Sequence, residues 1–414
     1  MKTDLDNLLK SAGFDAIWVS GPSTHNPPMA YLCGTGQLTR ADLFVRPGHR
    51  PVLAHGVMER EEAAKSGFDL ITYDASRQRE LLKENPDDIL TASALYHKEL
   101  LEEAGVKQGR ILVTGVREIG AFHSMLNKLE ELMPGVQFAG DAQEAVLLQA
   151  RATKSPDEIQ RIRQVAQATM KVVQNTWDLL ANSEVSGQTL LKADGSPLTI
   201  GDVKAQIGLW MSENGLEDPD GFIFAIGKDA GVPHNSGTPS DPIELGKTIV
   251  YDIFPCEKGG GYFYDFTRTW CVGFAPPEVQ QAYDLVDRVH FAVLEGLEMG
   301  KNFSHSQTLT CELFEAAGHN TIRKDKTAVE GYVHGLGHGL GLNVHEKPSS
   351  GNLDDPSNEL QPGHVFTIEP GLYYPESKGW GIRIEDSYFM HPDGSVERFV
   401  DFPHQLVIPL KSQA

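Results

Sequence analysis

The sequence predicts an α/β domain over residues 1–150 followed by an α+β domain over residues 151–414. Three observations predict this division. The length of 414 residues indicates two or three domains, at roughly 100–200 residues per domain. Short apolar runs alternate with helical patterns in the first 150 residues, as in α/β domains. From residue 248 onward, β-rich segments dominate instead.

In the first domain, the short apolar runs at 15–20 and 111–114 are expected to form strands. The stretches 58–66 and 119–132 place apolar residues at helical spacing and are expected to form helices. No group of catalytic side-chain types occurs here at a suggestive spacing. The functional side chains are therefore expected in the second domain.

The second domain opens on a helix with three start signals. Ser155 is the N-cap, Pro156 takes the first helical position and Glu158 completes a capping box. Apolar residues then recur at helical spacing. Two later helices are expected over 277–300 and 306–318.

The rest of the second domain divides into turns and strands. The Gly-, Ser- and Asp-rich stretch 184–198 indicates an exposed loop or a hairpin. Four β-rich segments then suggest antiparallel pairs that carry acidic residues: 248–254, 261–272, 364–374 and 379–390.

The charge balance argues against polyanionic partners. Lys and Arg number 36 and Asp and Glu number 57, which gives a formal net charge of −21. Such a protein repels phosphate backbones and anionic lipid, so we expect neither nucleic-acid nor membrane binding. The sequence also shows no run near the ~20 apolar residues of a membrane span.

The cysteines indicate a reducing compartment. The four of them are widely scattered and form no C-x-x-C pair, which excludes a disulfide scaffold or a four-cysteine zinc site. The first twenty residues include acidic side chains and lack the apolar core of a signal peptide. We therefore expect a cytoplasmic protein.

Two aspartates, Asp252 and Asp265, lie in consecutive β-rich segments joined by the turn-forming stretch 257–261. If the turn centres on Lys258-Gly259, the two carboxylates face each other directly. Like charges in that position are destabilising, and a cation is the usual neutralising group. The alternative is a bulge that turns one carboxylate to solvent.

A second acidic pair repeats this pattern. Glu369 and Glu385 lie in neighbouring β-rich segments, and a three-residue turn at 376–378 would bring them opposite each other. Two hairpins that each present opposed carboxylates are less expected by chance than one.

Histidines add to the acidic pairs. His334, His338 and His345 fall within twelve positions of a glycine-rich stretch. The glycines between 335 and 341 argue against a helix, so we expect extended or looped backbone. A phosphate-cradling loop and plain structural turns are competing interpretations. A dinucleotide fingerprint requires a following helix, however, and the stretch 346–351 breaks one.

Four carboxylates with one or two imidazoles form a hard, oxygen-rich ligand set. This set suits manganese or a similar divalent ion better than a structural zinc bound by thiolates. Two such ions would balance the four negative charges and could bridge a hydroxide, as in two-metal hydrolases.

The motifs DFTRT, HGLGHGLGLNVHE, TIEPGLY and GIRIED resemble those of the pita-bread-fold metallopeptidases, the family of aminopeptidase P, prolidase and methionine aminopeptidase. The resemblance covers roughly residues 150–410, and the preceding part is similar to the N-terminal domain of the aminopeptidase P and prolidase branch. It implies an α/β N-terminal domain followed by an α+β pita-bread catalytic domain of the creatinase and aminopeptidase type.

The resemblance also implies a ligand set for two divalent ions, Mn²⁺ first, with Co²⁺ or Zn²⁺ as alternatives. Asp265 and Glu385 would bridge the two ions. The five implied ligands are Asp252, Asp265, His338, Glu369 and Glu385.

Further residues match the substrate side of the family's site. His234 and His345 match histidines that contact the substrate or the reaction intermediate, and His334 and Arg383 match residues that line the pocket. Glu369 is expected to carry a proton from the attacking water to the leaving nitrogen. His234 and His345 would orient the substrate or stabilise developing charge.

The implied activity is hydrolysis of an Xaa-Pro bond at the N-terminus of short peptides or in dipeptides, by a protein that forms a homodimer. An aminopeptidase without proline preference is one alternative. A creatinase-like, metal-independent amidinohydrolase and a non-catalytic binding protein are two others, and the intact set of five ligands counts against both. The presence of the N-terminal domain favours the Xaa-Pro branch.

Overall fold

The computed structural model describes residues 4–34, 36–351 and 355–411. The chain divides into two compact units. The first comprises Met1–Arg151 with Gly259–Gly261, and the second comprises Ala152–Lys258 with Tyr262–Ala414.

The first unit is built on a six-stranded mixed sheet with the order β4-β3-β2-β1-β5-β6. Strands β1, β2 and β3 pair antiparallel, whereas β5 and β6 continue the sheet in parallel beside β1. The strands are β1 (Ala16–Gly21), β2 (Ala41–Val45), β3 (Val52–His55), β4 (Asp69–Thr72), β5 (Gly109–Gly115) and β6 (Val136–Ala139).

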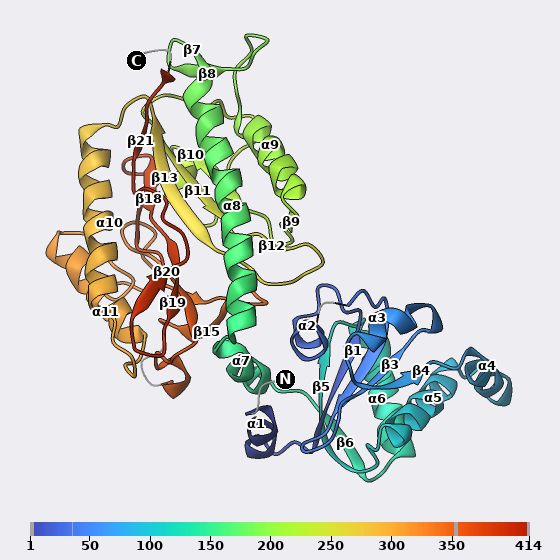
Figure 1. The fold of residues 1–414 in the computed structure, drawn as a ribbon. Helices are drawn as coiled ribbons and strands as arrows, with labels where there is room; N and C mark the ends of the chain where they lie inside the picture. Colours follow the sequence, from blue (N-terminus) through green and yellow to red (C-terminus); the bar gives the residue numbers. More distant parts are fainter. Residues whose placement is uncertain (1–3, 35, 352–354, 412–414) are drawn as a thin grey trace. The chain divides into compact units, whose positions relative to one another are not determined.

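Helices cover both faces of this sheet (Figure 1). Successive residues of β1 point to opposite faces: Trp18 belongs to one apolar cluster and Val19 to another. The expected α/β organisation is therefore present. The helices are α1 (Leu5–Ser11), α2 (Pro27–Cys33), α3 (Arg60–Ala64), α4 (Ala75–Glu84), α5 (Ile89–Glu103), α6 (Ile119–Leu132) and α7 (Ala145–Ala152), with a 3₁₀ turn η1 (Val57–Glu59).

The second unit holds two larger sheets. The first has the order β10-β11-β13-β21, from β10 (Ile223–Ile226), β11 (Thr248–Ile253), β13 (Phe266–Val272) and β21 (Val407–Ile408). The second has the order β15-β14-β16-β19-β20, from β14 (His338–Gly339), β15 (Glu346–Ser349), β16 (Val365–Ile368), β19 (Asp386–Met390) and β20 (Val396–Arg398).

Three two-stranded pairs complete the strands of the second unit in the part of the chain that the structure describes. They are β7 (Glu184–Ser186) with β8 (Thr189–Leu191), β9 (Leu216–Glu217) with β12 (Cys256–Glu257), and β17 (Gly371–Tyr374) with β18 (Trp380–Arg383). The first of these is a hairpin, which is one of the two alternatives expected for 184–198. Short 3₁₀ turns lie at η2 (Asp229–Gly231) and η3 (Pro356–Asn358).

Among the residues that the structure describes, four helices flank the strands of this unit: α8 (Pro156–Asn182), α9 (Ile200–Glu213), α10 (Pro277–Glu295) and α11 (Ser304–Ala316). The capping box between Ser155 and Glu158 forms as expected. In Figure 1, α8 and α9 lie on one side of the strands and α10 and α11 on the other. Trp177 of α8 packs edge-on against Trp270 of β13, with 5.5 Å between ring centroids.

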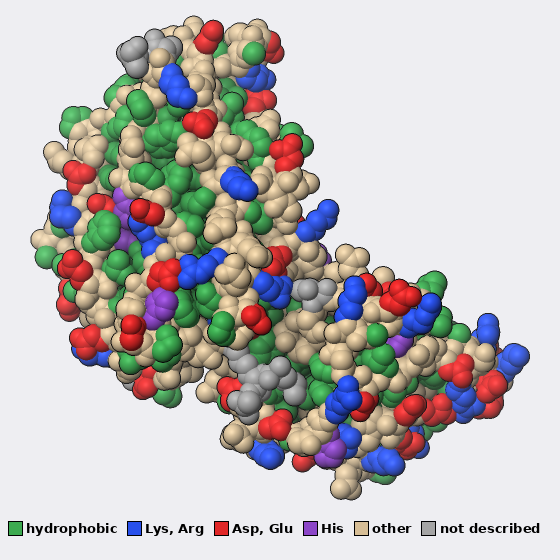
Figure 2. Space-filling view, viewed as in Figure 1, with side chains coloured by type: hydrophobic (Ala, Val, Ile, Leu, Met, Phe, Trp, Pro, Cys, Tyr) green, Lys and Arg blue, Asp and Glu red, His purple; other side chains and the backbone are tan. Residues whose placement is uncertain are grey.

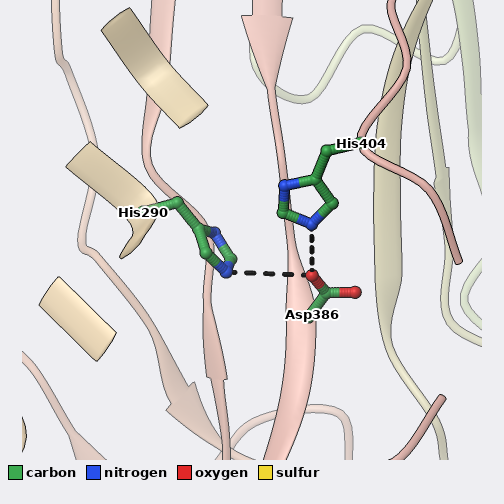
Figure 3. Close-up of side chains that lie close together, drawn as sticks. All are labelled: His290, Asp386 and His404. Atoms are coloured by element: carbon green, nitrogen blue, oxygen red, sulfur yellow. Dashed lines mark hydrogen bonds and ion pairs between the residues drawn. The ribbon is translucent and has the colours of Figure 1, made fainter. Parts of the chain in front are cut away.

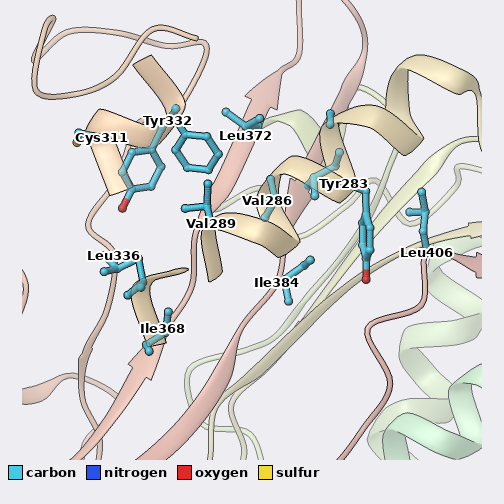
Figure 4. Packing of buried hydrophobic residues seen from close by; sticks show 14 of the residues in the cluster. Tyr283, Val286, Val289, Cys311, Tyr332, Leu336, Ile368, Leu372, Ile384 and Leu406 are labelled. Carbon is cyan, nitrogen blue, oxygen red and sulfur yellow. The ribbon is translucent and has the colours of Figure 1, made fainter. Parts of the chain in front are cut away.

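The main core of the second unit lies between α10, α11 and the strands (Figure 4). Val286 and Val289 of α10 belong to the same apolar cluster as Ile368 and Ile384, the residues that directly precede Glu369 and Glu385. Close-packed interiors have low compressibility. This packing therefore fixes the positions of the adjacent ends of β16 and β19.

The expected register of the first acidic hairpin is wrong. Asp252 pairs with Thr267 and not with Asp265, so the two aspartates are diagonal neighbours on one face rather than directly opposed. The ladder instead centres on Gly259 and Gly260, both of which have positive φ angles of 96° and 81°. A turn whose two central residues have positive φ favours glycine at both positions. The turn therefore lies one residue later than the expected centre at Lys258-Gly259.

The expected register of the second acidic hairpin is confirmed. Gly371 pairs with Arg383 in β17–β18, and Ile368 pairs with Asp386 in β16–β19. Both ladders have the same register, so Glu369 and Glu385 meet at the junction between them. The loop itself spans 375–379 and is longer than the three residues expected.

The surface carries both signs of charge. On the face seen in Figure 2, Asp and Glu side chains are interspersed with Lys and Arg. Arg77 of α4, for example, pairs with Glu80 and Glu99. In the described residues, no helix has the length and apolarity that crossing a membrane requires.

Candidate metal centre and active site

All nine residues singled out from the sequence line one cavity of about 1050 Å³ in the second unit. They come from separate elements. Asp252 lies in β11, Asp265 directly precedes β13 and His338 lies in β14, while Glu369 follows β16 and Glu385 precedes β19. His234, His334, His345 and Arg383 complete the set.

Three of the proposed ligands lie close enough to share one ion. One ligand atom from each of Asp265, His338 and Glu385 falls within 4.8 Å of the others. His338 Nε2 is 3.6 Å from Asp265 Oδ2 and 3.6 Å from Glu369 Oε1. These separations leave space for a cation between the donor atoms.

Several carboxylate oxygens of the site lack any other partner. Asp252 Oδ1, Asp265 Oδ1 and Glu385 Oε1 are buried, and none has a hydrogen-bond partner among the described residues. A buried acceptor without a partner is costly. Hard oxygen donors of this kind fit a divalent cation, so the residues present fit the metal ions that the sequence implies.

The electrostatics of the cavity point the same way. Burial, together with the negative charges of neighbouring carboxylates, raises the pKa of Asp265 and of Glu369 well above the usual range. Burial and the nearby Asp252 raise the pKa of Glu385 to about 8, although Arg383 and Thr267 oppose this rise. These carboxyl groups stay protonated unless a bound cation replaces the protons.

His338 is prepared to act as a neutral ligand. Burial first, and then the neighbouring His345, lowers the pKa of His338 to about 3. Its Nδ1 lies 3.1 Å from the carbonyl oxygen of Gly339 and can donate to it. Nε2 is then the unprotonated nitrogen, and it faces Asp265 and Glu369.

A chain of hydrogen bonds fixes the pocket wall next to Asp252. Arg383 Nη2 donates to Asp252 Oδ2 at 2.6 Å, and Arg383 Nη1 donates to Tyr373 Oη at 2.7 Å. Tyr373 Oη in turn lies 2.9 Å from His334 Nε2, while His334 Nδ1 lies 2.6 Å from the Gly335 carbonyl oxygen. Both ring nitrogens of His334 are therefore engaged, and burial lowers its pKa to about 3.

Two of these residues escaped the sequence analysis. Tyr373 belongs to the chain just described, and Thr267 Oγ1 donates to Glu385 Oε2 at 2.8 Å. The signal for Tyr373 was its strand position, since Gly371 pairs with Arg383 and Tyr373 points to the same face. Thr267 likewise lies two residues after Asp265 on the same strand face.

The substrate-side histidines lie around the proposed ligands. The rings of His345 and His338 meet edge-on with 4.3 Å between centroids. Burial, and then the neighbouring His234, lowers the pKa of His345. His234 and His345 therefore lie near enough to influence each other across the cavity that both line.

A second cluster of metal-binding side-chain types lies outside this cavity (Figure 3). Asp386 Oδ2 is 2.8 Å from His404 Nε2 and 3.7 Å from His290 Nε2. Arg268 Nη2 also donates to Asp386 Oδ1 at 2.8 Å. His404 Nδ1 lies 2.6 Å from a carboxylate oxygen of Asp287.

This second cluster is a buried ion-pair network rather than a metal centre. The guanidinium of Arg268 already balances the carboxylate of Asp386, and the nitrogens that would bind an ion have protein partners. Burial lowers the pKa of His290 to about 3. Arg268 Nη1 also donates to the backbone oxygen of Glu385 at 2.8 Å, which links the network to the strand that carries the proposed ligand.

Comparison with known proteins agrees with the sequence resemblance. Residues 160–392 match metallopeptidase family M24. The chain is 31% identical over 265 residues to the probable dipeptidase PepE of Mycobacterium tuberculosis, covering 64% of this chain and 62% of that protein. It is 24% identical over 416 residues to the Xaa-Pro dipeptidase of Lactobacillus delbrueckii subsp. lactis, covering 98% of each.

Solved structures show the fold. The prolidase from Pyrococcus furiosus superimposes with a TM-score of 0.71 at 22% identity, covering 96% of this chain and 99% of that one. The X-Pro aminopeptidase from Thermotoga maritima gives 0.72 at 21% identity, covering 97% and 99%. The predicted α/β domain followed by a pita-bread domain is thus confirmed. Since the family match covers more than half of the chain, the protein belongs to metallopeptidase family M24.

Proposed function

We propose that this protein is a dinuclear-metal peptidase that hydrolyses the Xaa-Pro bond at the N-terminus of short peptides or in dipeptides. The observation that carries the proposal is the meeting of four buried or half-buried carboxylates and a neutral histidine in one cavity, with three buried oxygens that lack a partner. A relative that matches 98% of the chain bears the name Xaa-Pro dipeptidase.

The ions would be held by Asp252, Asp265, His338, Glu369 and Glu385. When bound, such ions lower the pKa of water to near neutrality and polarise a carbonyl group. The donor set of oxygens and one imidazole favours Mn²⁺, with Co²⁺ or Zn²⁺ as alternatives.

The remaining steps fall to the side chains of the protein. Glu369, which lies beside His338 at the end of β16, would accept a proton from the attacking water and deliver it to the leaving nitrogen. A leaving proline nitrogen is a secondary amine and needs that proton. His234 and His345 would orient the scissile carbonyl and stabilise the charge that develops on its oxygen.

Arg383 and His334 have different parts in this scheme. Arg383 holds Asp252 in place through a 2.6 Å contact and lines the pocket. His334 has both ring nitrogens engaged, so it would shape the pocket rather than transfer protons. The first unit would serve as the N-terminal domain of the prolidase branch. A homodimer and a cytoplasmic location remain predictions from the sequence.

The test is hydrolysis by chelator-treated protein, with and without Mn²⁺, of Ala-Pro, Ala-Pro-Ala, Ala-Ala-Ala and creatine. We expect Mn²⁺-dependent cleavage of the proline peptides alone. Equal cleavage of Ala-Ala-Ala would indicate an aminopeptidase without proline preference. Metal-independent turnover of creatine would overturn the proposal. A preference for Ala-Pro over Ala-Pro-Ala would indicate a dipeptidase.

A further inference from the structure

A buried ion pair joins two distant points of the second unit. Lys154 Nζ lies 3.1 Å from Glu346 Oε2, and the two side chains are 1% and 0% exposed. Lys154 precedes α8, and Glu346 begins β15 directly after His345. Charges are rarely so fully buried, and they persist only when paired and hydrogen-bonded.

The carboxylate of Glu346 lies inside the glycine-rich turn. Its Oε1 accepts hydrogen bonds from the backbone N–H of Leu342 at 3.0 Å and of Asn343 at 3.2 Å. A Cβ atom on Gly341 would come within 2.3 Å of Oε2. The glycine at 341 is therefore needed to let the carboxylate approach, which explains part of the unusual composition of this stretch.

Lys154 is itself held by the backbone around it. Its Nζ donates to the Ala152 carbonyl oxygen at 3.2 Å, and its backbone N–H donates to Gly363 at 2.7 Å. The ammonium group thus has a fixed position from which it neutralises Glu346. The turn 341–346 is tied by this pair to the segment that opens α8.

His345 lies in this turn, directly before Glu346. Its ring packs against His338 and lines the cavity, while the next residue in the chain is anchored on the opposite side by Lys154. We propose that Lys154 and Glu346 are positioning residues that hold His345 at the substrate side of the cavity. This inference rests on the proposed function of His345.

The positioning role predicts an effect that passes through His345. Lys154→Met removes the ammonium group that lies 3.1 Å from Glu346 Oε2, so the turn should shift. A displacement of about 1 Å at a catalytic group can lower turnover roughly 100-fold. We expect Lys154→Met to lower kcat by about 10- to 100-fold on Ala-Pro-Ala, with little change in KM and both metal ions retained.

The experiment is a double-mutant cycle under Mn²⁺. Lys154→Met is compared with the parent in the wild-type and in the His345→Ala background, with metal content measured by elemental analysis. We expect less than about a twofold effect on kcat in the His345→Ala background. An equal loss in both backgrounds, or loss of metal, would overturn the proposal, because the pair would then support the fold or the ligands and not His345.

Two further variants separate the loss of the ion pair from a general loss of stability. Lys154→Met/Glu346→Gln removes both charges yet keeps an oxygen that accepts from Leu342 and Asn343, so it should fold and recover part of the lost kcat. Arg163→Met is the matched control. It removes another cation of the same helix region, one that pairs with Glu397 and lies outside the cavity, and should leave kcat unchanged.

A readout without substrate separates this proposal from the peptidase activity. In protein labelled with ¹³C in its histidine rings, the His345 signal is identified by its loss in His345→Ala. It should shift or broaden in Lys154→Met and stay unchanged in Arg163→Met. An unchanged His345 signal in Lys154→Met would refute the positioning role even if the protein had no peptidase activity.

Discussion

Removal of one negative charge from the cavity should stabilise the metal-free protein. We choose Glu385→Gln, because Gln keeps an oxygen that accepts the 2.8 Å hydrogen bond from Thr267 Oγ1. The change removes a buried carboxylate whose pKa is raised to about 8 by burial and by Asp252. Proteins commonly tolerate such unfavourable charges where function requires them.

The magnitude follows from the rise of the Glu385 pKa, from an ordinary 4.5 to about 8. A raised carboxyl pKa means stability that is fully present below pH 4.5 and is lost as the pH rises toward 8. At about 1.4 kcal/mol per pKa unit, and with neighbouring carboxyls sharing the effect, we expect Glu385→Gln to add roughly 2–4 kcal/mol at pH 8. At pH 5 the gain should be under about 1 kcal/mol.

Asp386→Asn is the matched control, since it removes the neighbouring carboxylate. Burial alone would raise the pKa of Asp386, but Arg268 and His404 outweigh it and hold the pKa well below the usual range. Its stabilisation is present above the unfolded pKa and is lost as the pH falls. Asp386→Asn should therefore destabilise by about 3–5 kcal/mol at both pH 5 and pH 8.

The assay is denaturant unfolding of chelator-treated wild type and the two variants at pH 5 and pH 8. We expect a higher midpoint for Glu385→Gln at pH 8 alone and a lower one for Asp386→Asn at both. Circular dichroism at each pH checks that all three proteins start folded. A Glu385→Gln variant less stable than wild type at pH 8, or equally stabilised at both pH values, would refute the electrostatic reasoning.

Three other outcomes are expected. Chelation should abolish peptidase activity, and Mn²⁺ at 100 times its dissociation constant should restore it and add about 2.7 kcal/mol to stability; full activity in metal-free protein would contradict the metal centre. Asp265→Asn should lose at least one ion by elemental analysis and nearly all turnover. Tyr373→Phe removes the hydroxyl that joins Arg383 and His334. Loss of these hydrogen bonds costs about 1–2 kcal/mol, so kcat/KM should fall roughly tenfold. The metal content, measured by elemental analysis, should stay unchanged.

The two acidic hairpins show how far spacing predicts register. The Glu369–Glu385 register was correct because the expected turn centre at Ser377 agrees with both flanking ladders. The predicted Asp252–Asp265 register was wrong, because the three consecutive glycines at 259–261 allow several turn centres of similar conformational free energy. A one-residue shift of the turn centre moved the partner by two positions, which kept both aspartates on the same face.

The candidate site was predictable where chemistry shows in residue type. Three histidines within twelve positions and carboxylates in successive β-rich segments predicted a metal site, and the family resemblance assigned its individual ligands. Tyr373 and Thr267 are ordinary strand residues, and only their contacts reveal that they hold Arg383 and Glu385. Lys154 lies 192 positions before Glu346, and no local pattern joins residues so far apart.

The dipeptide Glu385-Asp386 places one carboxylate in the cavity and the next one in the buried ion-pair network. Successive side chains of a strand point to opposite faces, so one carboxylate enters the cavity and its neighbour enters the network behind it. The first is unfavourable without a cation, whereas the second is neutralised by Arg268, which also donates to the backbone oxygen of Glu385. Because the same guanidinium contacts both residues, the ion pair on one face stabilises the strand that must hold an unfavourable charge on the other.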